Sequence, residues 1–148
     1  IATLNLAWDY ATAKAAMEDI LANYPQIDGI LSQGGAMTQA AIDAYVEQGL
    51  PLVPMTGEAS NGFLRVWLEQ ADNGLQSMAF CNPTWISVTA LDTAIRILNG
   101  EEVEKEITVT VPPVTLETAK DLYRPDVNDS FWVHTYLSDA EIKELFPK

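Results

Sequence analysis

Four short groups of polar, aromatic and glycine residues are able to do chemistry in this chain, and each follows a run typical of a strand. They are Trp8 and Asp9; Gln33, Gly34 and Gly35; residues 57–61 (GEASN); and Cys81 with Asn82. An indole face packs against the C–H face of a sugar ring, while carboxylates and carboxamides accept and donate hydrogen bonds to hydroxyls. The set therefore favours binding of a neutral polyol.

These residues also have purely structural interpretations. Trp8 ends an alternating apolar run and is equally suited to the core. Glu58 and Asn61 precede a helix, where acidic and Asn side chains commonly act as caps. Gly34 relieves crowding in a tight turn, and Asn82 is suited to be an N-cap. Binding and structural roles both stay open at this point.

Motifs of the common enzyme classes are missing from the sequence. It contains neither a Gly-Lys-Ser/Thr phosphate loop nor a GxGxxG turn. The single histidine, His134, lies outside the four groups, so neither a His-rich metal site nor a nucleophile–base pair can be assembled. Cys81 is predicted to be a buried small side chain rather than a reactive thiol. We expect no catalytic residue, no metal and no cofactor.

Charge and composition exclude further classes of partner. The chain has 148 residues, with 8 Lys+Arg against 21 Asp+Glu and a net charge of −13. Binding to nucleic acid needs clustered basic side chains, and these are few and scattered. The 48% hydrophobic and 20% charged residues are typical of a globular domain. No apolar run approaches the length of a transmembrane helix.

Apolar periodicity alternates between strand and helix along the chain. Helical stripes alternate with short strands, which predicts right-handed crossovers and a three-layer α/β fold: a mainly parallel sheet with helices on both faces. Ligands of such sheets bind at the carboxyl ends of the strands, where the four groups lie. Strands are predicted over 4–8, 28–33, 51–55, 76–81 and 107–111, and helices over 13–24, 37–49, 63–74 and 83–98.

The predicted helix 83–98 differs from the others because its apolar surface wraps around much of the helix. It carries two apolar rows and therefore needs cover on more than one side. Beyond Pro112 and Pro113 the pattern weakens to two short helices, over 115–123 and up to Phe146, the second with a Ser138–Glu141 capping box. The two rows are Ile86, Ala90, Ala94 and Ile97, and Val88, Leu91, Ile95 and Leu98.

Several segments together resemble the type I periplasmic sugar-binding proteins, the galactose- and ribose-binding substrate receptors of ABC transporters. The resemblance spans most of residues 1–111, and its specificity lies in the order and spacing of the segments. The segments are residues 8–14 (WDYATAK), 24–30 (YPQIDGI), 32–37 (SQGGAM), 57–59 (GEA) and 98–101 (LNGE).

The resemblance implies roles for particular residues. The family's sugar-stacking aromatic falls on Trp8, its third-loop carboxylate on Glu58, and its fourth-loop amide on Cys81 or, as the chemistry favours, Asn82. The Asn of the family's second loop is replaced by Gly34, which leaves space for a larger or differently oriented ligand. The ligand-binding set expected is Trp8, Asp9, Gln33, Gly34, Glu58, Asn61 and Asn82.

Family members have two α/β lobes and about twice this length, so the resemblance implies that the chain is mainly the C-terminal lobe. Residues 1–111 form that lobe, helix 83–98 normally packs in the other lobe, and residues 112–148 form a tail packing on the lobe or hinge. The implied function is an extracytoplasmic, periplasmic solute receptor that delivers a sugar to the membrane permease of an ABC importer. In that case the helix leaves an exposed apolar patch here.

Two other functions remain open. The first is the effector-binding domain of a sugar-responsive transcription regulator, which shares this fold within the family. The second is a small α/β enzyme, which needs an ionisable pair with perturbed pKa values at the strand ends. The chain begins at Ile1 without Met, so we expect a piece of a longer protein whose N-terminus, a signal peptide or a helix-turn-helix, distinguishes receptor from regulator.

Overall fold

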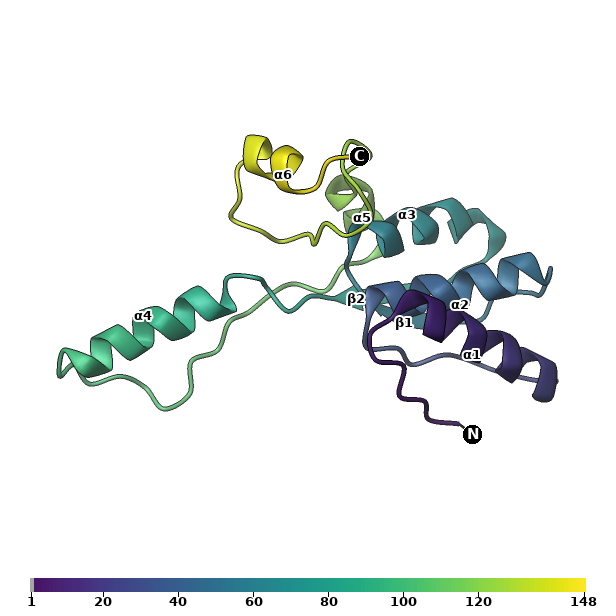
Figure 1. Ribbon diagram of the computed structural model, residues 1–148, viewed down its shortest axis with the longest axis horizontal. Coiled ribbons are helices and arrows are strands. Elements are labelled where there is room, and N and C mark those ends of the chain that lie inside the picture. The colour runs from purple at the N-terminus through teal and green to yellow at the C-terminus, as the bar shows by residue number, and fades with distance from the viewer. Residues whose placement is uncertain (1) are drawn as a thin grey trace.

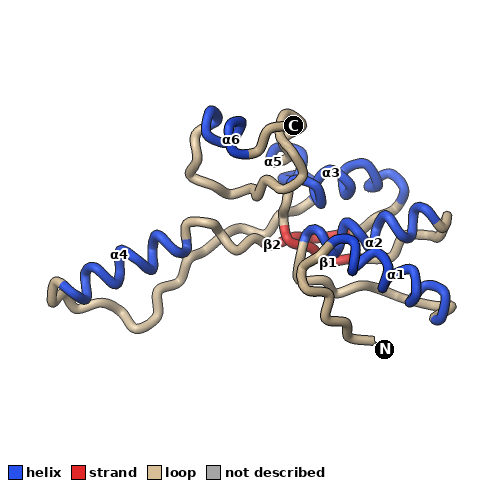
Figure 2. Tube along the Cα trace, in the orientation of Figure 1, coloured by secondary structure: helices blue, strands red, loops and turns tan. Residues whose placement is uncertain are grey.

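The computed structural model describes residues 2–148, and it has the predicted α/β architecture (Figure 1). Two parallel strands lie beside a row of helices, as the tube in Figure 2 shows. The strands are β1 (Met55–Glu58) and β2 (Ser77–Phe80); the helices are α1 (Tyr10–Asn23), α2 (Gly35–Glu47), α3 (Asn61–Gln70), α4 (Ile86–Leu98), α5 (Leu116–Leu122) and α6 (Asp139–Leu145), with a 3-10 turn η1 at Ala71–Asn73.

The sheet is shorter than the apolar pattern predicts. Strands β1 and β2 pair in parallel from Met55 opposite Ser77 to Glu58 opposite Phe80, with α3 as the crossover between them. The predicted strand 28–33 contributes one parallel bridge, between Ile30 and Met55. The third strand begins only at the end of the predicted segment 51–55, which contains two prolines that have no N–H to donate to a ladder.

Two predicted strands do not form. Residues 4–8 and 107–111 alternate in polarity, yet neither finds a neighbouring strand within residues 2–148. A strand without a paired edge has no ladder to hold it. The first segment instead turns sharply into α1, where Ala7 and Trp8 have φ values of 51° and 60° and the Asp9 N–H donates to the Leu6 carbonyl.

The helices begin where the sequence supplies caps. Asp9 Oδ1 accepts from the Thr12 N–H at 2.8 Å at the start of α1, and Ser60 caps α3 through the Phe63 N–H. The Ser138–Glu141 capping box predicted for the last helix is confirmed at α6. Helices α1, α2 and α3 then pack side by side.

The hydrophobic core lies between these helices and one face of the sheet. Met55 and Ala79 point into it, and Gly57 is required there because a Cβ would lie 2.6 Å from Cζ of Phe63. Met78 and Phe80, on the opposite face, are 44% and 53% exposed, and no helix layer formed by residues 2–148 covers them. The largest fully buried side chains are Trp67, Phe63, Ile42 and Leu64.

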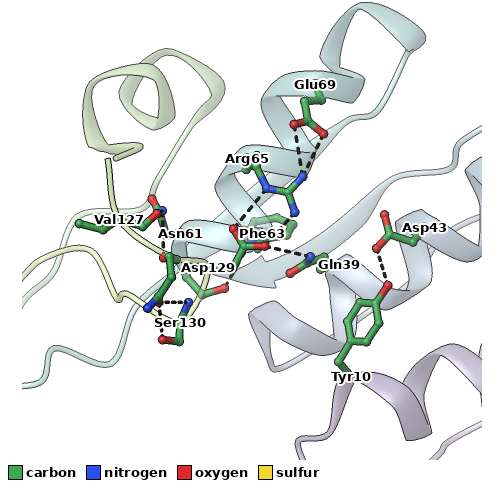
Figure 3. Close-up of polar contacts among 12 residues, drawn as sticks. Tyr10, Gln39, Asp43, Asn61, Phe63, Arg65, Glu69, Val127, Asp129 and Ser130 are labelled. Atoms are coloured by element: carbon green, nitrogen blue, oxygen red, sulfur yellow. Dashed lines mark hydrogen bonds and ion pairs between the residues drawn. The ribbon is translucent and has the colours of Figure 1, made fainter. Parts of the chain in front are cut away.

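The C-terminal tail returns to this core. Val114 pairs with Ala79 through reciprocal main-chain hydrogen bonds, and the Val133 N–H donates to the Ala59 carbonyl. Arg65 on α3 also donates a hydrogen bond from Nη2 to Oδ2 of Asp129, at 2.8 Å (Figure 3). The tail residues buried in the core are Val114, Ala119, Val127, Phe131, Val133 and Ile142.

Helix α4 projects away from the rest of the chain on two extended connections (Figure 1). None of its residues is buried. Its row of Val88, Leu91, Ile95 and Leu98 is between 48% and 85% exposed, so the expected apolar patch is present. The other row faces a groove of about 500 Å³ that is closed on its far side by residues 103–109 of the returning chain.

Candidate functional site

Glu58 and Asn82 meet at the carboxyl end of the sheet. Glu58 is the last residue of β1 and lies opposite Phe80, the last of β2. The chain leaving β2 then brings the main-chain N–H of Asn82 near the Glu58 carboxylate. Burial raises the pKa of Glu58 above its ordinary value, although the nearby Asn82 N–H opposes the rise.

Trp8 and Gly34 meet at the same edge. A Cβ at Gly34 would lie 2.8 Å from Cε3 of Trp8, so the indole rests directly on the Gly34 backbone. Trp8 is 64% exposed, which rules out the core interpretation of its side chain. The backbone next to it is also tightly packed, because a Cβ at Gly35 would lie 2.5 Å from the Glu58 carbonyl oxygen.

These contacts join the four groups into one continuous edge. Trp8 lies on Gly34, Gly35 abuts the main chain of Glu58, and the Glu58 carboxylate lies near the Asn82 N–H. Exposed Gln33 borders the same turn. The edge offers an uncovered indole face, a carboxylate and a carboxamide, which are the groups that hold a ring bearing hydroxyls.

Two predicted site residues have their side chains engaged in the fold. Asp9 is exposed, but its carboxylate accepts from both the N–H and the hydroxyl of Thr12, which lower its pKa. Asn61 is 1% exposed. Its carboxamide faces the tail and not solvent, so the expectation that it binds ligand hydroxyls is corrected: it secures residues 124–128.

Sequence reasoning missed the threonines that shape the Gly34 turn. Thr56 Oγ1 accepts from the Ser32 N–H and donates to the Ser32 carbonyl, both at 2.9 Å. Buried Thr38 lies within hydrogen-bonding distance of the Gly34 and Thr56 carbonyls, at 3.0 and 2.9 Å. Their partners lie on other elements, so single-sequence patterns carry no signal for this role.

Cys81 and His134 carry the one thiol and the one imidazole of the chain. Cys81 is half-buried, and burial raises the pKa of its thiol to about 11, so it stays protonated at neutral pH. Within residues 2–148, no group of three His, Cys, Asp or Glu side chains is placed to hold a metal ion. His134 is a half-buried residue of the tail with a φ of 61°.

Comparison with protein-family models then decides the family. The model described as "Periplasmic binding protein domain" matches residues 2–102. The chain belongs to this family. The match ends before Pro112 and Pro113, so the tail that completes the core of this periplasmic binding protein domain lies outside the matched range.

Solved structures share the fold of this periplasmic binding protein domain. One is an ABC transporter solute-binding protein from Agrobacterium vitis with bound D-fucose, at a TM-score of 0.64 and 21% identity over 84% of this chain and 44% of that one. Another is a periplasmic solute-binding protein from Actinobacillus succinogenes with bound D-allose, at a TM-score of 0.60 and 22% identity over 82% of this chain and 43% of that one.

A third is the arabinose-binding component of an ABC transporter from Shewanella sp. ANA-3, bound to L-arabinofuranose. Its TM-score is 0.61 and its identity 21%, over 76% of this chain and 38% of that one. The chain thus spans less than half the length of these proteins. A search of curated protein sequences finds no match. Among residues 2–148, no helix has the length and apolar character needed to cross a membrane.

Proposed function

We propose that this chain is one lobe of a solute-binding component of an ABC importer and that its ligand is a sugar. The observation that carries the proposal is that Trp8 and Gly34 lie beside Glu58 and Asn82, which stand at the carboxyl ends of β1 and β2. Three structural relatives have bound sugars, which supports the same ligand class. The partners are a neutral sugar and a membrane permease, and the location is extracytoplasmic.

The chemistry of binding follows from the exposed groups. The Trp8 indole supplies an apolar face for one side of a sugar ring, in contact with the ring's C–H bonds. Glu58 accepts hydrogen bonds from hydroxyls, and the Gln33 carboxamide both donates and accepts. Asn82, exposed and close in its main chain to the Glu58 carboxylate, supplies a second carboxamide. None of these groups performs a reaction, so the function is binding without catalysis.

The exposed face of α4 supports a second lobe. A helix with an uncovered apolar row requires cover from elsewhere, and this chain covers only 43% and 44% of two relatives, whose remaining length is able to provide it. We therefore assign α4 to the partner lobe and residues 112–148 to a tail on this lobe. A ligand held between the lobes is enclosed by their closure.

Titration of the full two-lobed protein with D-allose, D-fucose and L-arabinose, measured by calorimetry, tests the proposal. We expect saturable binding of at least one sugar. Trp8→Ala should weaken it roughly three- to tenfold, because an aromatic contact is lost. Glu58→Gln should weaken it about ten- to a hundredfold, because hydrogen bonds to a charged acceptor are lost.

Glu18→Gln is the matched control, since Glu18 is an exposed carboxylate in the middle of α1. It should leave the affinity unchanged. Equal affinities of the parent, Trp8→Ala and Glu58→Gln chains would exclude the assigned site. Absence of binding for all three sugars, from protein shown by circular dichroism to be folded, would contradict a sugar as the ligand.

A further inference from the structure

A second hollow lies between the start of α4 and the C-terminal tail. It has a volume of about 380 Å³. One wall comes from Thr84, Trp85 and Val88, and the facing wall comes mainly from aromatic residues of the tail, among them Trp132 and Tyr136. Segments some fifty residues apart in sequence therefore form it jointly, and none of the residues of the candidate sugar site takes part in its lining.

The aromatic rings of this hollow are arranged in two pairs. Trp85 and Tyr136 lie with ring centroids 4.4 Å apart and planes inclined by 31°. Phe131 and Phe146 meet edge to face, with centroids 5.4 Å apart. Phe131 is buried and belongs to the core, whereas Tyr136 is 79% exposed. The first pair, whose Tyr136 ring is largely exposed, is called the Trp85–Tyr136 platform of the hollow.

The chemistry of the lining selects a neutral ligand that has both apolar faces and hydroxyls. No Lys or Arg lines the hollow, which disfavours a phosphate or a carboxylate. The indole N–H groups donate, and the Tyr136, Thr84 and Thr135 hydroxyls donate and accept. Aromatic faces together with such groups fit a sugar ring, as at Trp8.

The hollow also lies next to the candidate sugar site. Asn82 precedes Thr84 by two residues, so their Cα atoms are at most about 7 Å apart. On the other wall, Trp132 forms an antiparallel bridge with Ser60, two residues beyond Glu58. Asn82 is thus two residues from a residue that lines the hollow, and Glu58 is two residues from a residue that pairs with one.

We propose that this hollow is a second carbohydrate subsite and that the ligand has at least two sugar rings. The inference rests on the proposed function: the first ring lies at Trp8 and Glu58, and the second lies on the Trp85–Tyr136 platform. The space beside Gly34, expected from the sequence to admit a larger ligand, is filled by the side chains of Trp8 and Met37. Contact area for a longer ligand is therefore offered at the second subsite instead.

The four tryptophans of the chain allow a direct test by NMR, with the indole N–H signals assigned through Trp→Phe variants. Trp8 reports on the first subsite and Trp85 and Trp132 on the second, while buried Trp67 is an internal control. Glucose, maltose and cellobiose are the probes. We expect glucose to shift the Trp8 signal alone and a disaccharide to shift the Trp8, Trp85 and Trp132 signals, with Trp67 unchanged.

The other outcomes separate the two proposals. Disaccharide shifts confined to Trp8 would overturn the second subsite and leave the proposed function standing. Shifts at Trp85 and Trp132 without Trp8 would overturn the binding edge and make the hollow a separate sugar site. Unchanged signals at all three would overturn both proposals.

Variants of Tyr136 test the platform without disturbing the core, because its ring is largely exposed. Tyr136→Ala should weaken disaccharide binding roughly three- to tenfold and leave glucose binding unchanged. Tyr136→Phe retains the ring and should keep most of the disaccharide affinity. Leu145→Ala removes an exposed apolar side chain of α6 outside the hollow and should change neither affinity. Equal losses for both sugars in Tyr136→Ala would contradict the subsite.

Discussion

The Asn61 carboxamide and the main chain of Arg124 form two hydrogen bonds with each other. Asn61 Nδ2 donates to the Arg124 carbonyl at 2.8 Å, and the Arg124 N–H donates to Asn61 Oδ1 at 2.9 Å (Figure 3 shows Asn61 among its neighbours). The same amide nitrogen lies 3.3 and 3.2 Å from the carbonyls of Val127 and Asn128. One side chain on α3 therefore fixes the path of the tail.

Asn61→Ala should lower the free energy of unfolding by about 2–4 kcal/mol, because several buried main-chain groups lose their partner together. Urea unfolding followed by circular dichroism measures the change. Asn73→Ala is the control, since Asn73 is exposed and hydrogen-bonds only Gln70, and it should cost less than about 0.5 kcal/mol. Similar losses in both variants would contradict the special role of Asn61.

Gly34→Ala should displace the Trp8 indole. The added Cβ would lie 2.8 Å from Cε3 of Trp8 and 2.7 Å from the Met37 Cε, so both side chains must shift. Trp8 is free to do so because it is mostly exposed, and stability should fall by less than about 1 kcal/mol. We expect a change in tryptophan emission and weaker sugar binding. The emission change should vanish in a Trp8→Phe background; its persistence there would exclude this contact as the cause.

Glu58→Gln should stabilise the fold near neutral pH. A carboxyl whose pKa is raised by burial contributes stability that is fully present below the unfolded pKa and is lost as the pH rises through the folded pKa. Because Gln carries no charge, the Glu58→Gln variant does not lose stability as the pH rises. In urea unfolding across a pH series, the gain should grow as the pH rises through the raised pKa of Glu58 and disappear below the ordinary value of 4.5.

Glu18→Gln at an exposed position should show no such pH-dependent gain. A gain from Glu58→Gln that is equally large in acid would point to packing rather than ionisation. Loss of sugar affinity together with higher stability would mark Glu58 as a residue kept for binding at the expense of the fold.

The exposed row of α4 should make the chain self-associate. Leu91 and Ile95 are 63% and 48% exposed on the uncovered face. Leu91→Lys combined with Ile95→Lys should shift the species seen by sedimentation velocity toward monomer. Ala15→Lys combined with Ala22→Lys adds the same charge to exposed positions of α1 and is the control. If both pairs reduced association equally, charge rather than the apolar row would be responsible.

Helix periodicity and caps predicted the helices well, because both act within a few residues of sequence. The apolar stripe that ends at Tyr24 and the Ser138–Glu141 capping box are each complete within one short segment of sequence. Strand prediction failed at 4–8 and 107–111 for the opposite reason. Alternating polarity makes a strand only where another edge is available, and here neither segment meets one within residues 2–148.

The candidate site could be predicted in part. The turns after the strands follow from the α/β alternation, and those after β1 and β2 bring Glu58 near Asn82 as strand-end residues should meet. Trp8 reaches Gly34 although no paired strand precedes it. The role of Asn61 could not be predicted, because its partners lie 63 to 67 residues away in a segment without periodicity. A polar residue after a strand looks the same in sequence whether it faces ligand or tail.

The return of the tail to the core has a consequence for how the protein is made. Phe63 and Trp67 emerge from the ribosome long before Val133 and Ile142, which share their core, and the whole projecting arm lies between them. Contacts of such separation form slowly, because a long loop must close first. The lobe completes its folding only after synthesis has passed the tail, and during that interval a chaperone that shields apolar surface should retain the nascent chain.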